Sequence, residues 1–251
     1  MMLDGRVAIV TGAARGLGQE YSVALARNGA KIVAADILPC EATVAKVVEA
    51  GSEAIAVKVD VTKEPQTRAM AEEAVRRFGR IDVLVNNAAD LGRWIAFDQI
   101  TEEEWDRVMA VNVKGIWNCC KAAVPAMRRQ GKGKIINVSS GTIWMGPPLY
   151  LHYVASKGAV FALTRSLARE LSGSGINVNT LTPGYTMTQA ATSLGDRESV
   201  ETVKRELLNA QIIKRSEQPA DLSPTVVFLA SDGSDFITGQ AFNVDGGGAL
   251  H

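Results

Sequence analysis

Seven short apolar runs, rich in β-branched residues, alternate with helical segments along this chain of 251 residues. The runs are Arg6–Thr11, Lys31–Asp36, Ala54–Val59, Ile81–Asn86, Lys134–Ser139, Ile176–Leu181 and Ala241–Val244. This alternation predicts an α/β fold with a parallel sheet, because a crossover helix must carry the chain back before the next parallel strand begins. Ligands of such sheets bind outside the carboxyl ends of the strands, so we expect a site at that edge.

The composition narrows the class of protein. With 47% hydrophobic residues, the chain can bury the core of one domain spanning residues 1–251. The net charge is zero and no basic run exceeds two residues, which argues against a nucleic-acid partner. No apolar stretch approaches the ~20 residues that span a bilayer, and residues 1–5 lack an apolar signal region. We therefore expect a cytoplasmic protein without a membrane partner.

Metal chemistry is not expected. The two histidines, His152 and His251, are too few for a histidine cluster, and the three cysteines show no Cys-x-x-Cys spacing. We predict packing roles for the cysteines and a structural or substrate-lining role for His152.

A glycine turn follows the first apolar run directly. Gly12, Gly16 and Gly18 are spaced Gly-x-x-x-Gly-x-Gly, and a helical pattern begins around Leu17. Glycine allows a tight turn and lets a pyrophosphate approach main-chain N–H groups, while a helix N-terminus supplies partial positive charge. Strand, turn and helix therefore predict a dinucleotide site.

Asp36 ends the second apolar run, where a carboxylate would accept hydrogen bonds from ribose hydroxyls and repel a 2′-phosphate. Arg15 could contact such a phosphate, so two opposite charges compete. Because Ile37 adds no second cation, we expect NAD as the cofactor, with NADP fitting less well.

Tyr153 and Lys157 stand four residues apart in a segment, Tyr153–Leu171, that reads as helix, so both lie on one helical face. A tyrosine exchanges protons near neutral pH only if a positive charge stabilises the phenolate. Ser140 follows a predicted strand and can meet that face. The three side chains predict a proton-transfer site.

These motifs together resemble the short-chain dehydrogenase/reductase family over essentially the whole chain. Asn86-Asn87-Ala88-Ala89 is similar to the motif that closes the fourth strand, although Ala89 replaces the usual glycine, for which we expect a local backbone adjustment. The resemblance adds Asn112 as the fourth member of a catalytic tetrad with Ser140, Tyr153 and Lys157. Further cofactor contacts that it implies are Asp60, Val61, Asn87, Pro183, Thr186 and Thr188, beside Gly12, Arg15, Gly16, Leu17, Gly18, Asp36, Tyr153 and Lys157. By the same resemblance, the segment with Pro183, Gly184, Thr186 and Thr188 would hold the nicotinamide end of the cofactor.

The resemblance implies a doubly wound, Rossmann-type three-layer sandwich with a seven-stranded parallel sheet in the order 3-2-1-4-5-6-7. It also implies hydride transfer between a nicotinamide and an alcohol or carbonyl, with Tyr153 as general acid/base. Lys157 would lower the pKa of Tyr153 and Ser140 would bond the substrate oxygen. Asn112 would hold a water that relays protons from Lys157.

The substrate is expected between the cofactor and three segments, Asp90–Phe97, Gly141–Tyr150 and Tyr185–Ile213. Their aromatic residues favour an apolar pocket and an apolar secondary alcohol or ketone, aromatic or cyclic. The candidate substrate residues are Trp94, Trp144, Tyr150 and Tyr185.

Two alternatives remain open. An NADPH-dependent 3-oxoacyl-(acyl-carrier-protein) reductase shares every motif, and it would need a basic surface beside the pocket to meet its acidic carrier. Asp36 argues against the cofactor of such an enzyme, while Arg128, Arg129, Lys132 and Lys134 could form the surface. A non-catalytic dinucleotide sensor or scaffold would not need the complete tetrad.

The segment Trp105–Met127 carries apolar residues on more than one helical face, which favours a homo-oligomer, with a homotetramer preferred over a dimer by the resemblance. The chain ends in a tail, Asp245–His251, that is expected to be flexible. Its last residues are expected to fray in solvent rather than fold over a neighbouring subunit's pocket.

Overall fold

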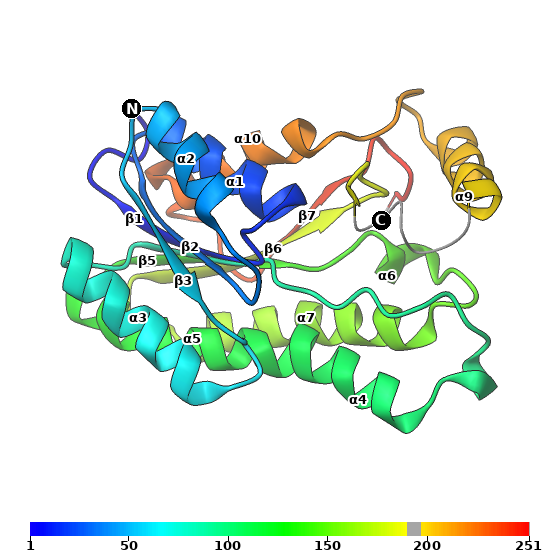
Figure 1. Ribbon diagram of the computed structural model, residues 1–251, viewed down its shortest axis with the longest axis horizontal. Helices are drawn as coiled ribbons and strands as arrows, with labels where there is room; N and C mark the ends of the chain where they lie inside the picture. The colour runs from blue at the N-terminus through cyan, green and yellow to red at the C-terminus, as the bar shows by residue number, and fades with distance from the viewer. Residues whose placement is uncertain (190–196, 251) are drawn as a thin grey trace.

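The structure, a computed structural model, describes residues 1–189 and 197–250. Within these residues the chain forms one parallel sheet of seven strands in the order β3-β2-β1-β4-β5-β6-β7 (Figure 1), which confirms the predicted fold class and strand order. The strands are β1 (Val7–Thr11), β2 (Lys31–Asp36), β3 (Ala54–Lys58), β4 (Val83–Asn86), β5 (Gly133–Val138), β6 (Ile176–Pro183) and β7 (Ala241–Val244).

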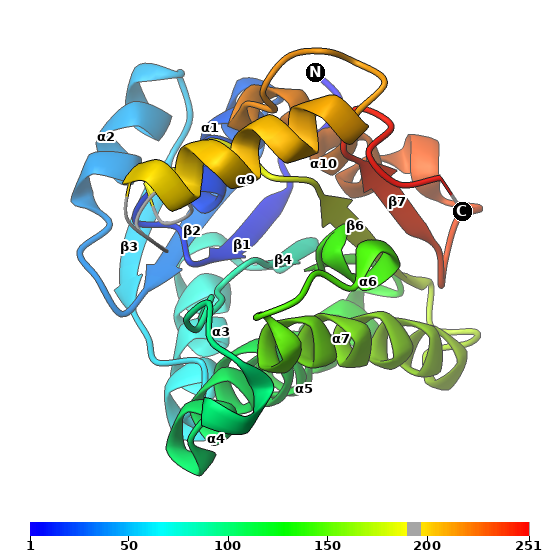
Figure 2. The same cartoon turned by 90° about the vertical axis from the view of Figure 1, so that its right-hand side faces the viewer.

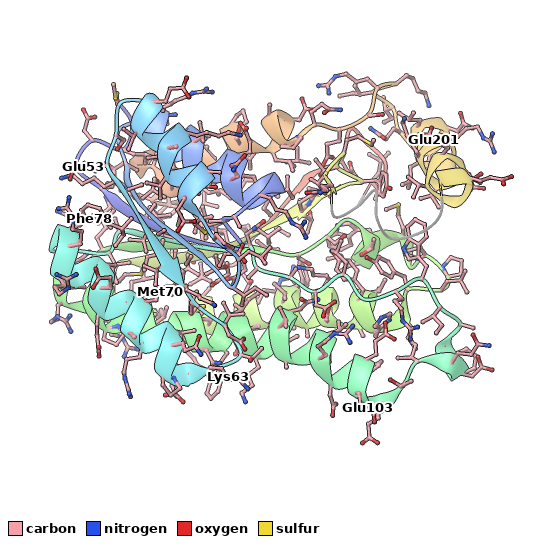
Figure 3. All side chains as sticks on the ribbon, in the orientation of Figure 1. Glu53, Lys63, Met70, Phe78, Glu103 and Glu201 are labelled. Atoms are coloured by element: carbon pink, nitrogen blue, oxygen red, sulfur yellow. The ribbon has the colours of Figure 1, made fainter. Side chains whose placement is uncertain are left out.

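Helices cover both faces of the sheet. One face carries α1 (Gly16–Arg27), α2 (Glu41–Glu49) and α10 (Pro219–Ala230), and the other carries α3 (Glu64–Phe78), α5 (Gly115–Gln130) and α7 (Leu151–Glu170). At the carboxyl edge, which faces the viewer in Figure 2, lie α4 (Glu102–Met109), α6 (Thr142–Met145) and α9 (Arg197–Ala210). Figure 3 labels Glu103 on α4 and Glu201 on α9, the two helices that border this edge from opposite sides. Short helical turns occur at Phe97–Gln99, Ala110–Lys114 and Asp232–Ser234.

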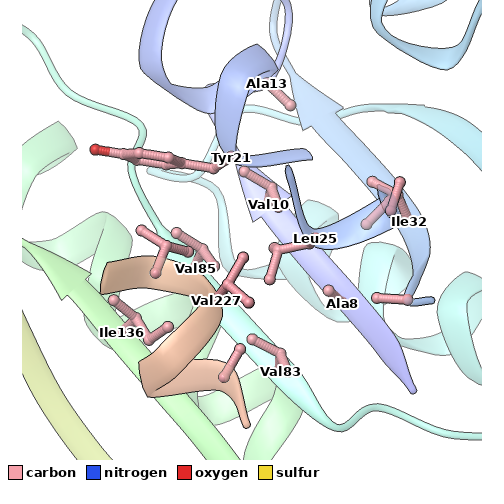
Figure 4. Close-up of a cluster of buried hydrophobic side chains, with 14 of the residues drawn as sticks. Ala8, Val10, Ala13, Tyr21, Leu25, Ile32, Val83, Val85, Ile136 and Val227 are labelled. Carbon is pink, nitrogen blue, oxygen red and sulfur yellow. The ribbon is translucent and has the colours of Figure 1, made fainter. Parts of the chain in front are cut away.

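The core explains why the strands are apolar on both faces. Successive strand residues point to opposite sides, so Val7 and Ile9 pack toward α3 and α5, whereas Ala8 and Val10 pack toward α1 and α10. Figure 4 shows the cluster that contains Ala8 and Val10, in which Tyr21 of α1 lies over β1 and β4. A parallel sheet buried in this way leaves its carboxyl edge as the place for a ligand.

The strand order reverses at β1, which pairs with β2 on one side and β4 on the other. Crevices at such reversals are where doubly wound sheets bind ligands. The glycine turn after β1 and the residues that follow β4 meet there. Helix α7 begins at Leu151, two residues before the predicted start, which places Tyr153 in its first turn.

The segment Trp105–Met127 is interrupted rather than continuous. Helix α4 passes into a π-helical turn, Ala110–Lys114, before α5 begins, and the Gly115 N–H bonds to the Ala110 carbonyl five residues back. The extra residue of a π turn rotates the helix face locally, and such turns are frequent at functional sites. Asn112 lies in this turn and is fully buried.

The carboxyl tail is held more firmly than the sequence predicted. The Asp245 carboxylate accepts hydrogen bonds from the N–H groups of Gly247, Gly248 and Ala249, at 2.8–3.0 Å. Fraying therefore does not extend to these residues, although Leu250 is exposed and His251 lies outside the described residues. Across residues 1–189 and 197–250, every helix is too short or too polar to cross a membrane.

Candidate active site

A cavity of about 920 Å³ opens at the carboxyl edge of the sheet, near the upper end of the range for ligand pockets. It gathers nearly all of the predicted site residues. Those that line it are Gly12, Arg15, Gly16, Leu17, Asp36, Asp60, Val61, Asn87, Trp94, Ser140, Tyr150, Tyr153, Lys157, Pro183, Tyr185, Thr186 and Thr188. Three predicted residues, Gly18, Asn112 and Trp144, are not among the lining residues. Residues 190–196 of the third substrate segment lie outside the described residues.

The glycine turn is shaped by its neighbours. Gly12 and Gly16 have φ angles of +66° and +58°, which favour glycine. A Cβ on Gly18 would lie 2.1 Å from the Gly12 carbonyl oxygen, so Gly18 permits the turn to pack on α1 and does not itself line the cavity.

Asn87, the residue after β4, stabilises this turn. Its amide nitrogen donates to the carbonyls of Thr11 and Gly12, at 3.0 and 3.2 Å, and its main-chain N–H donates to the Thr11 hydroxyl. Ala89 lines the cavity, and its φ angle lies outside the left-handed region, so an alanine side chain causes no backbone strain there.

Two opposite charges stand at the end of the cavity beside β2. The Asp36 carboxylate accepts N–H bonds from Ala14 and Leu38, at 2.9 and 3.0 Å, which tie it to the glycine turn. Arg15 is exposed and donates to the Gln189 side chain at 3.3 Å. Glycine turn, carboxylate and helix N-terminus fit a dinucleotide, with its ribose toward Asp36.

Ser140, Tyr153 and Lys157 come together on the opposite wall. All three are nearly buried, with Tyr153 at 8% exposure and Lys157 at 2%. The Lys157 ammonium donates to the Val138 carbonyl at 2.9 Å and lies 5.5 Å from the centroid of the Tyr153 ring. The carbonyl of Val138 thus holds the cation beside the phenol at the carboxyl end of β5.

Burial dominates the protonation of this group. It raises the pKa of Tyr153 to about 12, while a hydrogen bond with Ser140 acts in the opposite direction. Burial also lowers the pKa of Lys157 to about 8. The hydrogen bond with Ser140 favours the phenolate, while the Lys157 ammonium is directed to the Val138 carbonyl. The lowering of the pKa of Tyr153 by Lys157 stays a prediction.

Asn112 uses its side chain to hold the loop after β4. Its amide nitrogen donates to the Asp90 carbonyl and the Ser156 hydroxyl, both at 2.9 Å, and its oxygen accepts the Asp90 N–H at 2.7 Å. Ser156 in turn donates to the Tyr153 carbonyl. Asn112 therefore connects that loop to the helix of Tyr153, and its role in a water relay from Lys157 stays a prediction.

Aromatic rings line the part of the cavity where the substrate is predicted. Tyr150 stacks on Tyr153, with ring centroids 4.5 Å apart, and Trp94 packs edge-on against Tyr150 at 6.4 Å. Tyr185 also lines the cavity. Trp144 instead packs edge-on against Phe161 of α7, at 5.4 Å, which explains its absence from the wall.

Leu149 lines the same region with a φ angle of 62°, an uncommon conformation for leucine. Its carbonyl accepts the Ile95 N–H at 2.8 Å, which joins the two segments that carry Trp94 and Tyr150. Strained residues of this kind cluster at ligand sites.

Sequence reasoning missed a cluster of polar side chains around a buried carboxylate behind this wall. Glu104 of α4 is 3% exposed and accepts three hydrogen bonds from Arg93, which hold the pKa of Glu104 below its usual value. His152, fully buried, lies 3.4 Å from the same carboxylate, in accord with the structural role predicted for it. The partners are far apart in sequence, so no local motif could have indicated the cluster.

Glu217 was also missed. It is 6% exposed and lies behind the loop of residues 183–188, where it bonds to Gly184 and Thr186. A carboxylate in an otherwise ordinary loop gave no signal, because its burial depends on how that loop folds. In the described part of the chain, no cluster of three or more His, Cys, Asp or Glu side chains could hold a metal ion.

Known proteins resemble this chain along its length. Residues 12–249 match a family model described as enoyl-(acyl carrier protein) reductase. The 3-oxoacyl-[acyl-carrier-protein] reductase FabG of Staphylococcus aureus is 39% identical over 243 residues, which cover 96% of each chain.

Two solved structures also resemble this chain along its length. A protein of Sinorhizobium meliloti, provisionally named a short-chain alcohol dehydrogenase, superposes with a TM-score of 0.93 at 33% identity and full coverage of both chains. A 3-ketoacyl-(acyl-carrier-protein) reductase of Brucella melitensis, complexed with NADH, gives a TM-score of 0.89 at 32% identity, covering 99% of this chain and all of the other.

Proposed function

This chain belongs to the short-chain dehydrogenase/reductase family of oxidoreductases, and on that premise we propose that it transfers hydride between NAD(H) and an apolar secondary alcohol or ketone. The observation that carries the proposal is the meeting of Ser140, Tyr153 and Lys157 in one cavity with the glycine turn and Asp36. A protein that only sensed or stored the dinucleotide would not need the proton-transfer residues at that wall.

The residues divide the chemistry between them. A bound nicotinamide supplies hydride in reduction and accepts it in oxidation. The Tyr153 phenol donates a proton to the carbonyl oxygen in reduction, and its phenolate takes the hydroxyl proton in oxidation. Ser140 bonds the same oxygen and orients it. The buried Lys157 provides the positive charge of the site, and Tyr150 and Trp94 exclude water from one side.

NAD is the proposed cofactor because Asp36 stands at the ribose end of the cavity. A carboxylate there accepts hydrogen bonds from ribose hydroxyls and repels a 2′-phosphate. Arg15 lines the same region but is exposed, so water screens its attraction for a phosphate. The complex of the Brucella melitensis protein with NADH is consistent with this choice.

Replacing Asp36 with alanine should narrow the preference for NAD by about ten- to a hundredfold, the usual range for one charged hydrogen bond. The ratio of kcat/KM values with NAD and NADP measures it. Glu41→Gln removes a nearby exposed carboxylate outside the cavity and should leave the ratio unchanged. An unchanged ratio in the alanine variant would remove Asp36 from the cofactor assignment.

An NADPH-dependent 3-oxoacyl-(acyl-carrier-protein) reductase is the second candidate, favoured by the names of the S. aureus and B. melitensis relatives. Such an enzyme must attract an acidic carrier to the mouth of its pocket. Arg128 and Arg129 end α5, next to the amino end of β5, whereas the cavity lies at the carboxyl end of that strand. Within one protomer the basic cluster is therefore at the wrong edge, which favours a free small molecule.

Lys132 and Lys134 do not supply a basic surface for a carrier either. Lys132 pairs with Asp232 and Asp235, and Lys134, 1% exposed, pairs with Asp235 at 2.7 Å. Their charges are satisfied within the protomer, which leaves less to attract a carrier.

A panel of substrates distinguishes the two candidates. Cyclic and aryl ketones, and a 3-oxoacyl group on a carrier protein, would each be offered with NADH and with NADPH while the absorbance of reduced nicotinamide is followed. We expect the highest kcat/KM with a free ketone and NADH. A carrier-bound substrate preferred by a hundredfold, with NADPH, would establish the second candidate.

We also propose a homo-oligomer, tetramer or dimer, formed through α4 and α5. Much of the apolar surface that predicted it is buried inside the protomer, as Val108, Ile116 and Cys119 show. Trp105 and Trp117 remain 37% and 49% exposed on these helices. Exposed tryptophans are typical of subunit contacts, and sedimentation of a monomer at micromolar concentration would contradict the proposal.

A further inference from the structure

We propose that Glu217 couples the charge of the bound nicotinamide ring to the uptake or release of one proton, through the loop of residues 183–188 that it holds. Glu217 is in this view a positioning residue that makes the binding of oxidised and reduced cofactor depend differently on pH. The inference rests on the proposed function only in requiring a nicotinamide dinucleotide, and not on the identity of the substrate.

Glu217 holds this loop by three hydrogen bonds. Its carboxylate accepts the Gly184 N–H at 3.2 Å and the Thr186 hydroxyl, and its main-chain carbonyl accepts the Met187 N–H at 3.0 Å. Gly184, Tyr185 and Thr186 line the cavity, whereas Glu217 is not among the lining residues. The carboxylate therefore lies directly behind the wall that the resemblance assigns to the nicotinamide end.

The place is crowded, so the carboxylate cannot simply move away. A Cβ on Gly184 would lie 2.9 Å both from the Glu217 carboxylate and from the Asp245 Cβ. Glu217 is 6% exposed and Thr186 is also 6% exposed. A change in the charge of Glu217 must therefore be answered by the hydrogen bonds of the loop itself.

The acidic groups that surround Glu217 oppose its ionisation. Asp245, which follows β7, and Asp221 of α10 are negative, and Asp245 already accepts three main-chain N–H bonds. Burial is the largest effect and raises the pKa of Glu217 to about 7, although the bonds from Thr186 and Gly184 lower it.

The remaining charged and titratable neighbours do little to stabilise the ionised form of Glu217. Arg215 lies close enough to interact electrostatically with Glu217, but its guanidinium donates hydrogen bonds to both carboxylate oxygens of Asp221. From α1, Tyr21 and then Glu20 face this region. The Tyr21 hydroxyl is buried without a hydrogen-bond partner and points away from the apolar cluster in Figure 4. Glu217 is thus a buried carboxyl poised between two protonation states.

A positive charge on the cavity side of the loop of residues 183–188 would favour the ionised form of Glu217. The nicotinamide ring carries a positive charge in NAD⁺ and none in NADH, and an opposite charge nearby favours the ionised carboxyl. Binding of NAD⁺ should therefore release a proton from Glu217 to solvent. Binding of NADH only deepens the burial, which favours the protonated form. By linkage, the preference for NAD⁺ over NADH must increase as the pH rises through the pKa of Glu217.

The test compares dissociation constants of NAD⁺ and NADH for the wild-type protein, Glu217→Gln and Glu170→Gln. Tryptophan quenching and NADH fluorescence report binding without any substrate. Between about pH 6 and about pH 7.5, which brackets the pKa of Glu217, the ratio of the two constants should change about three- to tenfold in the wild type. A tenfold change corresponds to a difference of one pKa unit between the complexes.

The variants assign the effect to one carboxyl. Glu217→Gln keeps the size of the side chain, and its amide oxygen can accept the Gly184 N–H while its amide nitrogen donates to the Thr186 hydroxyl. The amide cannot ionise, so the ratio for this variant should be constant across the same range. Glu170→Gln makes the same chemical change at an exposed position on α7 and should follow the wild type. Lys157, with a pKa of about 8, contributes mainly above this range and equally in all three proteins.

Thr186→Val gives an independent measurement should Glu217→Gln fold poorly. It removes a hydrogen bond that favours the ionised carboxyl, so the pH at which the ratio changes should move upward. A constant ratio in the wild type, a pH dependence that survives in Glu217→Gln, or an unmoved midpoint in Thr186→Val would overturn the inference. If neither nucleotide binds, the proposed function fails as well, whereas binding with a constant ratio refutes only the role of Glu217.

Discussion

Replacing Tyr153 with phenylalanine is expected to lower turnover by roughly two or more powers of ten, because the variant lacks the hydroxyl proposed to transfer the proton. Burial holds the pKa of Tyr153 at about 12, so the group arrives at the substrate as a phenol ready to donate in reduction. The ring of phenylalanine preserves the stack on Tyr150, and NADH should bind nearly as well as before. Single-turnover rates with a good ketone, together with NADH fluorescence titrations, separate the two effects.

Tyr150→Phe is the matched comparison, since it removes a phenol from the adjoining ring of the same wall. It should change turnover by less than about tenfold, because Tyr150 contributes contact area and not the proton. Should Tyr153→Phe keep most of its turnover while Tyr150→Phe loses it, the proton would have to be assigned to Tyr150.

Gly18→Ala is expected to destabilise the protein by about 3 kcal/mol, the upper part of the range for overpacked sites. The added Cβ would stand 2.1 Å from the Gly12 carbonyl oxygen and 2.7 Å from the Asn87 amide nitrogen, and main-chain atoms cannot give way cheaply. Thermal unfolding should shift downward by about 6–12 °C. Because the displaced atoms shape the glycine turn, NADH affinity should fall by at least about tenfold.

Gly158→Ala provides the control, because Gly158 is also helical and a Cβ there would meet no atom within 4 Å. It should be neutral or stabilise the protein by up to about 1 kcal/mol, as alanine does in helix interiors. Equal effects of the two substitutions on thermal unfolding would show that Gly18 is not required for packing of the turn.

Much of the fold followed from local patterns. Each strand is a short apolar run bounded by glycine, aspartate or asparagine, and helices long enough to return the chain separate the strands, so the alternation could be recognised without knowing any contact. Several residues that line the cavity were predicted for the same reason, since they stand at or next to the end of a strand, as Asp36 and Asn87 do.

Features that depend on tertiary packing were harder to predict. Trp144 lies in a segment that borders the cavity, but its ring turns to Phe161, and nothing in the sequence distinguishes the two faces of such a short helix. The burial of Glu104 and Glu217 arises only when distant segments meet. Residue spacing predicted that Lys157 lies near Tyr153, but it could not predict the burial that raises the pKa of Tyr153.

The π turn at Ala110–Lys114 joins α4 and α5 almost without a break, yet lets the two helices pack against different neighbours. Without the added residue, α4 and α5 would present a single stripe to one partner. With it, α4 packs against α7, while α5 packs against α3 and β5. A deletion of one residue here would restore a regular helix and withdraw Asn112 from Asp90 and Ser156 together. The length of this segment is therefore under tighter constraint than the identity of most of its side chains.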